Sequence, residues 1–396
     1  MKVPKIFKSS KTEPTPYVCA FIPQDILEHV ANAPDIDEEV RQSLRSTIAT
    51  SEEAHKDRVA VGDSDANPHE PNLPPADAKA PQLSGTQDSE AETQDGRAEV
   101  LIFNGFNSDY AELPGLLLRK SGQGPVTDSA ANDCYWTMNH AQTFFRHYYG
   151  WDSLDDKNHA LIGTVHARYN MANAYYIGGR NQMLFGNGNQ YMYNFAKSWD
   201  VVGHELTHGI IQFSSGLIYN GMSGALNEHC ADVFGSLLEQ CVLKQTVEQA
   251  DWLLAQDVLF PGDDRIAMRS MKAPGTAYDD PRVGKDTQPA HMKDYVYTQN
   301  DHGGVHINSG IPNKAFYLAA TRKGGYAWET AGKTWFAAMT TAKPNSTFGE
   351  FALLTIREAN KLVDPSFAPI IEQAWTDVGV LPIRSGWMSW LWGKKA

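Results

Sequence analysis

Two histidines and three carboxylates in the middle of the chain have the types and spacing of a metal site. His204 and His208 are four residues apart, which places both imidazoles on one face of an α-helix. Two neutral imidazoles so placed can bind one Zn²⁺ ion, and Glu205 could reach a zinc-bound water without ligating the metal. A catalytic zinc needs a third protein ligand, which Glu228 can supply. Asp232, one turn after Glu228, can hold the outer nitrogen of a ligand imidazole.

A bare His-x-x-x-His pair is more often part of a helix surface than of a metal site. Glu205 inside the pair and the pattern Asn-Glu-x-x-x-Asp over residues 227–232 favour the metal site. Glu228 lies twenty residues beyond His208, which is too far for one helix. The sequence therefore predicts a site built by two helices that fold together.

Longer motifs around these residues give the chain a resemblance to the thermolysin-like zinc metallopeptidases. The segments occur in the family's order and read Asp200-Val-Val-Gly-His-Glu-Leu-Thr-His208, Ser215-Gly-Leu-Ile-Tyr219, Gly224-Ala-Leu-Asn-Glu228, Met268-Arg-Ser-Met271 and Asp301-His-Gly-Gly-Val-His-Ile-Asn-Ser-Gly310. The resemblance covers about residues 98 to 383. A short pro-region and no visible signal peptide make the chain most similar to the protealysin-like branch.

The resemblance implies an α+β fold in two halves with a cleft between them. A β-rich half, residues 98–213, should end in the His-Glu-x-x-His helix, and residues 214–383 should form a helical half. It also implies a zinc-dependent neutral endopeptidase that uses Glu205 as general base. Tyr219 and His306 would donate hydrogen bonds to the oxyanion, and Asp301 would orient His306.

The family's substrate-binding residues also have matches in this chain. Arg269 matches an arginine that binds a substrate carbonyl oxygen, and Asn173 and Ala174 match the edge that holds the substrate main chain as an added strand. The pocket for the residue after the cut is matched by apolar side chains, namely Phe195, Val201, Val258 and Met268. An apolar residue is therefore expected immediately after the scissile bond.

A calcium site is matched only in part. Asp200, Glu239 and Asp251 match three carboxylates of the family's main Ca²⁺ site, which suits a hard cation. Leu253 and Gln256 stand where the family has two further glutamates. The resemblance therefore implies a site for one Ca²⁺ ion instead of two.

The segment before residue 98 has the layout of a zymogen. Residues 1–16 are predicted to be a disordered start, and residues 17–54 a small helical pro-region with Val40, Leu44 and Ile48 at helical spacing. Residues 55–97 read as a flexible acidic linker, because eight acids, five prolines and one lysine lie between residues 63 and 95. The pro-region is expected to act as an intramolecular inhibitor until the linker is cut.

Composition limits the other partners. The net charge of −13 over 396 residues excludes nucleic acid as an expected partner. No apolar run approaches membrane-spanning length, and the Trp-rich tail, residues 384–396, is expected to pack on the protein rather than to anchor it in a membrane. The basic start has no apolar core of an ordinary signal peptide, which predicts a protein that is secreted or released by another route, with a cytoplasmic precursor. The expected partners are polypeptide substrates and the pro-region, with a separate proteinaceous inhibitor left open.

Other readings remain open from sequence alone. A catalytically silent zinc-binding regulatory module would keep the ligands, and a zinc aminopeptidase would share His-Glu-x-x-His with a distant glutamate. The four cysteines, at positions 19, 134, 230 and 241, are predicted to be free thiols. Cys19 is read as an ordinary pro-region cysteine, and the alternative is a thiol that caps the zinc and keeps the enzyme latent.

Overall fold

The computed structural model describes residues 18–34, 36–61, 96–107, 112–168, 171–193, 195–263, 266–363 and 365–382. The predicted disordered start, most of the predicted linker and the Trp-rich tail lie outside these residues.

The pro-region consists of one short strand and two helices. Strand β1 (Val18–Ala20) is followed by helix α1 (Gln24–Asn32), which begins after Pro23, and by helix α2 (Glu38–Val61). The α2 helix continues seven residues past the boundary at residue 54 that its periodicity predicts. The Arg41 side chain donates hydrogen bonds to main-chain carbonyls between the helices, including that of Ile36 at 3.1 Å, and this fixes the turn from α1 to α2.

A six-stranded mixed sheet forms the core of the first half, with strand order β1-β5-β6-β4-β2-β3. Parallel pairing joins β2 to β4 and β4 to β6, and the other neighbours are antiparallel. The chain after residue 98 contributes the strands β2 (Val100–Asn104), β3 (Leu116–Lys120), β4 (Leu161–Val165), β5 (Ala174–Ile177) and β6 (Gln182–Phe185). The pro-region strand β1 therefore adds to β5, which is the outer strand of the sheet made by the rest of the chain.

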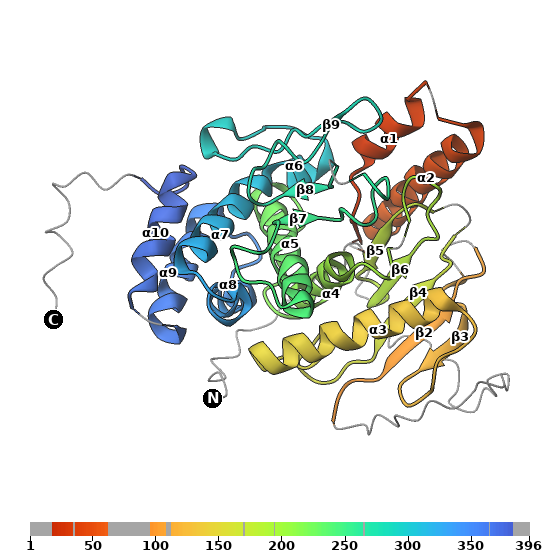
Figure 1. The fold of residues 1–396 in the computed structure, drawn as a ribbon, viewed down its shortest axis with the longest axis horizontal. Coiled ribbons are helices and arrows are strands. Elements are labelled where there is room, and N and C mark those ends of the chain that lie inside the picture. Colours follow the sequence, from red (N-terminus) through yellow and green to blue (C-terminus); the bar gives the residue numbers. More distant parts are fainter. Residues whose placement is uncertain are drawn as a thin grey trace, which may run out of the picture.

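Three helices, α3 to α5, lie between the sheet of the first half and the helices of the second. Helix α3 (Ser129–Phe144) packs against β2 and β4 and continues into a π-helical turn, Phe145–Tyr149. Asp128 caps α3 by accepting a hydrogen bond from the Ala131 amide. Helices α4 (Trp199–Phe213) and α5 (Gly221–Leu243) lie side by side at the centre of the molecule (Figure 1).

The second half is mostly helical. It contains short β pairs between β7 (Leu253–Leu254) and β8 (Arg269–Ser270) and between β9 (Asp279–Asp280) and β10 (Gly284–Lys285). Its helices are α6 (Asp301–Asn308), α7 (Gly310–Lys323), α8 (Ala331–Thr341), α9 (Phe348–Leu362) and α10 (Phe367–Asp377). Helices α7 to α10 lie on the side of α5 opposite to α1 and α2 (Figure 1), whereas α6 contacts the segment that leads into α1. The expected β-rich half, central helix pair and helical half are thus all present.

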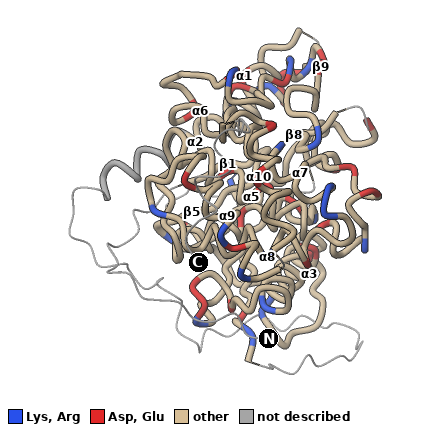
Figure 2. Tube along the Cα trace, turned by 90° about the vertical axis from the view of Figure 1, so that its left-hand side faces the viewer, with Lys and Arg blue, Asp and Glu red and all other residues tan. Residues whose placement is uncertain are grey.

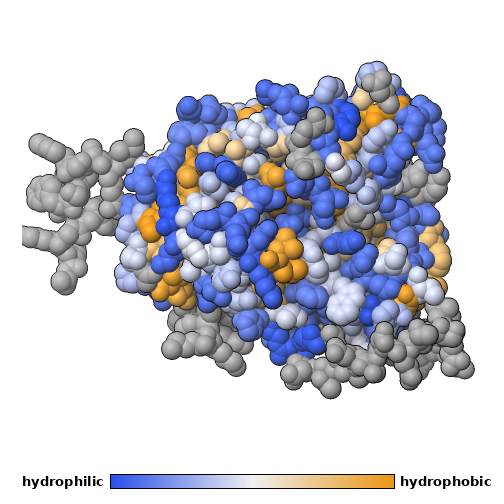
Figure 3. Space-filling model, in the orientation of Figure 1, coloured by the Kyte–Doolittle hydropathy of each residue, from blue (hydrophilic) through white to orange (hydrophobic). Residues whose placement is uncertain are grey.

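The surface of the described part is polar and mixed in charge. Basic and acidic positions are interspersed along the chain (Figure 2). On the face shown in Figure 3, hydrophilic residues predominate and hydrophobic ones form separate groups. Among the described residues, no helix is both long and apolar enough to cross a membrane.

Candidate active site

Helices α4 and α5 approach each other closely because each presents a glycine at the contact. A Cβ on Gly235 would lie 2.4 Å from the main-chain oxygen of Asp200, and a Cβ on Gly203 would lie 3.0 Å from the Gly235 Cα. No residue with a side chain fits there without moving a backbone. This close approach brings Glu228 on α5 to the two histidines on α4.

The two histidine rings and the Glu228 carboxylate converge at one buried point. His204 Nε2 lies 2.9 Å from His208 Nε2. Glu228 Oε2 lies 3.5 Å from His204 Nε2, and Glu228 Oε1 lies 3.6 Å from His208 Nε2. All three side chains are at most 1% exposed.

Hydrogen bonds on the outer ring nitrogens fix the tautomers of both histidines. His204 Nδ1 lies 2.9 Å from Asp232 Oδ1, and His208 Nδ1 lies 2.8 Å from Asn227 Oδ1. The Asn227 amide nitrogen donates to the carbonyl of Leu217, so its oxygen must face His208. Both Nδ1 atoms therefore carry the proton, and both Nε2 lone pairs point to the convergence point.

This arrangement fits a zinc ion. Ligand atoms about 2.0–2.2 Å from a tetrahedral zinc lie about 3.3–3.6 Å from one another, close to the separations between Glu228 and the rings. Burial lowers the pKa of His208 to about 3, so its ring is neutral, as a ligand must be. Burial raises the pKa of Glu228, but His306, His208 and His204 outweigh that effect and lower it to about 2. Glu228 Oε2 is nevertheless buried without a hydrogen-bond partner among the described residues, as expected for an atom that awaits a cation.

Glu205 lies beside this point without a partner of its own. Both of its carboxylate oxygens are buried and lack hydrogen-bond partners in the described part of the chain. Burial and the nearby Glu228 carboxylate raise the pKa of Glu205 well above its usual value. A buried carboxylate with a raised pKa is a candidate general base or acid.

Two hydrogen-bond donors face Glu228 from the other side of the site. The Tyr219 hydroxyl donates to Glu228 Oε1 and lies 3.2 Å from His306 Nε2. The His306 ring is held by Asp301, whose Oδ1 lies 2.5 Å from Nδ1 and whose Oδ2 accepts from the His306 amide at 2.8 Å. Burial lowers the pKa of His306, but Glu228 and Asp301 raise it to about 9, so both of its ring nitrogens are donors.

A left-handed turn places Asp301 on His306. Asp301, His302, Gly303 and Gly304 have φ values of 51°, 49°, 84° and 77°, in the left-handed region that glycine adopts freely and that Asp and His adopt more often than most other residues. A Cβ on Gly304 would also lie 2.7 Å from the Asn308 side-chain nitrogen. The two glycines therefore allow the chain to fold back so that Asp301 reaches the ring five residues later.

The residues expected to hold substrate main chain hold the pro-region instead. The Asn173 side-chain oxygen accepts from the Ile22 amide at 2.8 Å, and its nitrogen donates to the Ile22 carbonyl at 3.0 Å. Arg269 Nη1 donates to the Phe21 carbonyl at 3.1 Å. Arg269 also makes a bidentate ion pair with Asp232, so one arginine contacts both the carboxylate that holds His204 and the bound segment. Ala174 pairs with the segment as well, since its carbonyl accepts from the Phe21 amide.

The four predicted pocket side chains, Phe195, Val201, Val258 and Met268, are all buried in the same hydrophobic cluster. Met268 also lines a small cavity, together with Pro23, Ile26 and His306. The Phe21 ring is fully buried, with its centroid 4.8 Å from the His204 ring and 4.6 Å from the Arg269 guanidinium carbon. An apolar side chain of the pro-region thus lies beside the site on the Arg269 side.

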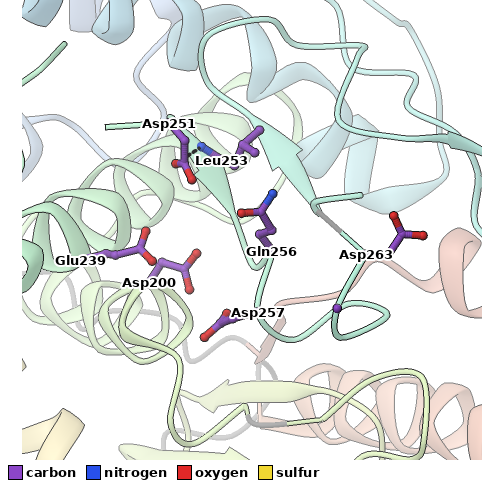
Figure 4. A pocket seen from close by; sticks show the side chains of 8 residues that line it. Asp200, Glu239, Asp251, Leu253, Gln256, Asp257 and Asp263 are labelled. Carbon is purple, nitrogen blue, oxygen red and sulfur yellow. Dashed lines mark hydrogen bonds between the residues drawn. The ribbon is translucent and has the colours of Figure 1, made fainter. Parts of the chain in front are cut away.

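A second group of acids lies at the far ends of α4 and α5. Asp200 and Glu239 project from these helices into one pocket, together with Asp251 and Asp257 from the segment after α5 (Figure 4). Burial and Asp257 raise the pKa of Asp200 to about 7, and burial with three neighbouring acids raises that of Glu239 to about 9. The Ser198 hydroxyl lies 2.6 Å from both Asp200 Oδ1 and Asp257 Oδ1, although it has one proton to donate. The three predicted calcium-binding acids are therefore together, and Asp257 joins them.

Three residues near these sites were missed by sequence reasoning. Asn227 directly precedes Glu228 and was quoted within the Asn-Glu motif, but the motif gives no sign that its amide holds His208. Asn313, which donates to Asp232 Oδ2 at 2.9 Å, lies 81 residues away on α7. Asp257 follows Gln256 and could have been found as the nearest acid after the lost glutamates.

Two family models together match most of the chain. Residues 83–212 match the thermolysin metallopeptidase catalytic domain, and residues 215–380 match the thermolysin metallopeptidase alpha-helical domain. An extracellular metalloprotease of Pectobacterium carotovorum subsp. carotovorum is 46% identical over 272 residues, which span 68% of this chain and 78% of that protein. Protease PrtS of a Photorhabdus species is 45% identical over 276 residues, with 68% and 73% covered. The solved precursor of protealysin, a metalloproteinase from Serratia proteamaculans, superposes with a TM-score of 0.76 and 37% identity, over 92% of this chain and all of that one.

Proposed function

This chain belongs to the thermolysin family of zinc metallopeptidases, and from that premise we propose that His204, His208 and Glu228 hold the catalytic zinc of an endopeptidase made as a zymogen. The observation that supports these ligands most strongly is the convergence of two tautomer-fixed Nε2 atoms on a carboxylate with an unpartnered buried oxygen. The family assignment makes the chain a metalloendopeptidase and sets aside a catalytically silent module.

Peptide hydrolysis by this site needs a base, an acid and an acceptor for the oxyanion charge. When bound, the zinc ion supplies a Lewis acid that lowers the pKa of a water molecule toward neutrality. Glu205 takes the proton from the attacking water and passes it to the leaving amine nitrogen. The burial of Glu205 and its lack of a hydrogen-bond partner leave both oxygens available for this transfer.

The oxyanion and the substrate main chain are held by separate groups. Tyr219 and His306 donate to the developing oxyanion, and Asp301 keeps the His306 ring in place. Asn173, Ala174 and Arg269 hold the main chain by the same groups that bind the pro-region. Phe195, Val201, Val258 and Met268 line the pocket for an apolar residue after the cut, and the buried Phe21 of the pro-region supports that preference.

The path of the pro-region favours an internal bond as the substrate. The bound segment enters as strand β1 on β5 and leaves past Arg269 into α1, so the cleft accepts chain on both sides of the ligands. An aminopeptidase would need an acidic subsite that binds a free amino terminus. A peptide with a blocked amino terminus should therefore be cut at a rate similar to that of its free-amine counterpart, and cleavage of the free-amine form alone would favour an aminopeptidase.

The ligand assignment is tested by changing Glu228. Glu228→Ala should lose stoichiometric zinc and activity together, because two imidazoles alone do not make a site for catalytic zinc. Asp286→Asn is a matched control, since Asp286 is also a buried acid but binds the amides of Gly275, Ala277 and Gln288. Metal analysis of the purified proteins checks both. Full zinc occupancy in Glu228→Ala would exclude Glu228 as a ligand.

We further propose that the acidic pocket binds one Ca²⁺ ion through Asp200, Glu239 and Asp251, with Asp257 as an additional ligand. Support comes from the position of these four acids around one pocket, which Asp263 also lines, and from the shared contact of Ser198 with two of them. Calcium at about 100 times its dissociation constant should raise the free energy of unfolding by about 2.7 kcal/mol. Glu239→Gln should abolish the shift in thermal unfolding, whereas Glu329→Gln, on the surface turn before α8, should keep it. No shift in the parent protein would exclude the site.

We propose that the protein acts outside the producing cell, as the name of its Pectobacterium relative indicates for that protein. A precursor kept inactive by its own pro-region could be made in the cytoplasm without damage to the cell. Antibody detection of the full-length form in cells and of a shortened form in the medium would support this location. A shortened form confined to cells would contradict it.

A separate proteinaceous inhibitor would bind the same cleft once the pro-region has left.

A further inference from the structure

The pro-region strand carries a cysteine into the zinc site. Cys19 lies opposite Tyr176 in the antiparallel pairing of β1 with β5. Because side chains alternate along a strand, its neighbours Val18 and Ala20 pack in a small cluster on the other face of the sheet, with Tyr175 and Ile177. Cys19 therefore points to the face that α4 covers, where its side chain is fully buried.

The thiol sulfur lies among the proposed metal ligands. Cys19 Sγ is 2.9 Å from Glu228 Oε1 and 3.2 Å from the Tyr219 hydroxyl. One ligand atom from each of Cys19, His204, His208 and Glu228 lies within 4.8 Å of the other three. A sulfur, two imidazole nitrogens and one carboxylate oxygen are four donors that zinc accepts, and four is the number that completes its tetrahedron.

A purely structural role for the buried thiol does not explain why polar atoms around it lack hydrogen-bond partners. Cys19 and Tyr219 both contact Oε1 of Glu228, while Oε2 remains buried and without a hydrogen-bond partner in the described part of the chain. Both oxygens of Glu205 beside it are in the same condition. A cation bound between the sulfur, the imidazoles and Glu228 gives Glu228 Oε2 a partner, whereas a thiol hydrogen bond to Oε1 does not.

We propose that in the precursor the Cys19 thiolate is the fourth ligand of the zinc ion and closes the position at which the attacking water binds in the active enzyme. This proposal rests on the proposed function of the site. On ligation, the thiol loses its proton to solvent and its sulfur replaces the water. On release of the pro-region, the sulfur–zinc bond breaks, a water takes the position, and the thiolate is reprotonated.

Ligation by Cys19 also explains why the bound segment is not itself cut. The Ala20 carbonyl oxygen lies 3.1 Å from His306 Nε2, and the next carbonyl, of Phe21, is held by Arg269. An extended chain with a carbonyl on the proposed oxyanion donor resembles a substrate in place. Hydrolysis still needs a water at the metal, and the sulfur from the preceding residue excludes it.

The test measures the ligands of the metal in a precursor that cannot process itself. Zinc X-ray absorption of the Glu205→Gln precursor should show one sulfur at about 2.3 Å, and adding Cys19→Ala should remove it while zinc stays bound. Cobalt in place of zinc should show a sulfur-to-metal charge-transfer band that disappears in the same variant. Cys134→Ala in the same background is the matched control, because Cys134 is equally buried but contacts Met138 on α3. It should keep both signals.

The outcomes separate this proposal from the proposed function. Zinc bound only by nitrogen and oxygen in the Glu205→Gln precursor would overturn ligation by Cys19 and leave the peptidase site intact. A precursor that binds no zinc with or without Cys19 would instead contradict the proposed ligands. With Glu205 restored, the Cys19→Ala precursor should shorten itself in less time than the Cys134→Ala precursor. Equal processing times for two variants with equal thermal stability would show that the sulfur does not enforce latency.

Discussion

At the scale of single residues, the donors on the oxyanion side depend on charge as much as on position. Asp301 binds both the ring and the backbone amide of His306 and so fixes the ring orientation, while Glu228 and Asp301 together raise the pKa of His306 and favour the imidazolium form. Tyr219 is held in the same region by Glu228. Each donor is therefore already oriented before a substrate arrives, which is the condition under which such hydrogen bonds stabilise a transition state.

Removal of the His306 donor should lower the rate without removing the metal. His306→Ala should keep zinc and fold but lower kcat/KM by about 10²–10³, the cost of one oxyanion donor. Asp301→Ala should lower it less, because Asp301 acts through His306. Steady-state kinetics and metal analysis of the mature enzymes check this. An unchanged kcat/KM in His306→Ala would remove the residue from the mechanism.

Residue types and spacing were enough to predict the proposed ligands and the contact of Asp232 with a ligand imidazole, but not the contacts of the two asparagines. His204, Glu205 and His208 are separated by helical intervals that any reader of the sequence can project onto one face. Asn227 and Asn313 reach the site from α5 and α7, and their contacts depend on how three helices pack. Cys19 lies 209 residues before Glu228, so its contact required the pairing of β1 with β5. The reading of Cys19 as an ordinary pro-region cysteine gave no weight to that pairing.

At the scale of elements, the α4–α5 contact decides whether the site can form. Gly203 and Gly235 let the two helix backbones come together, and the acidic pocket lies at the end of the same contact. Any increase in the separation of these helices should move Glu228 away from both histidines. The site is therefore sensitive to side-chain volume at positions that do not touch metal or substrate.

Gly235→Ala tests this sensitivity. The added Cβ would lie 2.4 Å from the Asp200 main-chain oxygen, which should cost about 1–3 kcal/mol of folding free energy and lower zinc affinity. Gly349→Ala on α9 is the control, since a Cβ there meets nothing within 4 Å and should stabilise by about 0.5–1 kcal/mol. Denaturant unfolding and zinc titration provide the two readouts. Wild-type stability and zinc affinity in Gly235→Ala would show that the helix contact can accommodate a Cβ atom.

Long periodic elements were predicted better than short ones. Helices α9 and α10 lie within one residue of the segments 348–362 and 367–378, whose periodicity predicts them, and α7 extends three residues beyond the predicted segment 310–320. The sequence of strand β3 does not predict a strand, because its three successive leucines do not alternate with polar residues. Most of this strand is only partly buried. The residues from Trp328 to Ala342 have helical periodicity throughout, but a break at Thr330 separates a 3₁₀ turn from α8. Backbone breaks of this kind leave no pattern in hydrophobicity.

At the scale of the whole molecule, the pro-region and the rest of the chain share one sheet. The pro-region contributes β1 to the sheet, and α2 adds polar contacts such as that between Ser51 and the Tyr175 hydroxyl at 2.7 Å. While the linker is intact, this segment is present at a high effective concentration beside the cleft. A cut between about Glu53 and Arg97 would end that advantage.

Self-processing is the prediction at this scale. Glu205→Gln removes the base but keeps the size of the side chain, so this variant should accumulate at the full 396 residues, whereas the parent should shorten by roughly ninety residues. Mass spectrometry after expression in a host that lacks other proteases measures both lengths. Glu329→Gln, a surface glutamate distant from the cleft, should process like the parent. If Glu205→Gln shortens as fast as the parent, another enzyme performs the activation.

The pairing of β1 with β5 also sets an order of events during synthesis. Cys19 leaves the ribosome 209 residues before Glu228, which at 5–20 residues per second is roughly 10–40 s. The segment that closes the cleft has therefore been synthesised before Glu228, the last of the proposed zinc ligands, is translated. No newly made chain passes through a stage in which a complete catalytic centre exists and its blocking strand does not. A producing cell is protected by the direction of translation itself, and a circular permutant with residues 18–61 moved to the carboxyl end would lose that protection even if its final fold were identical.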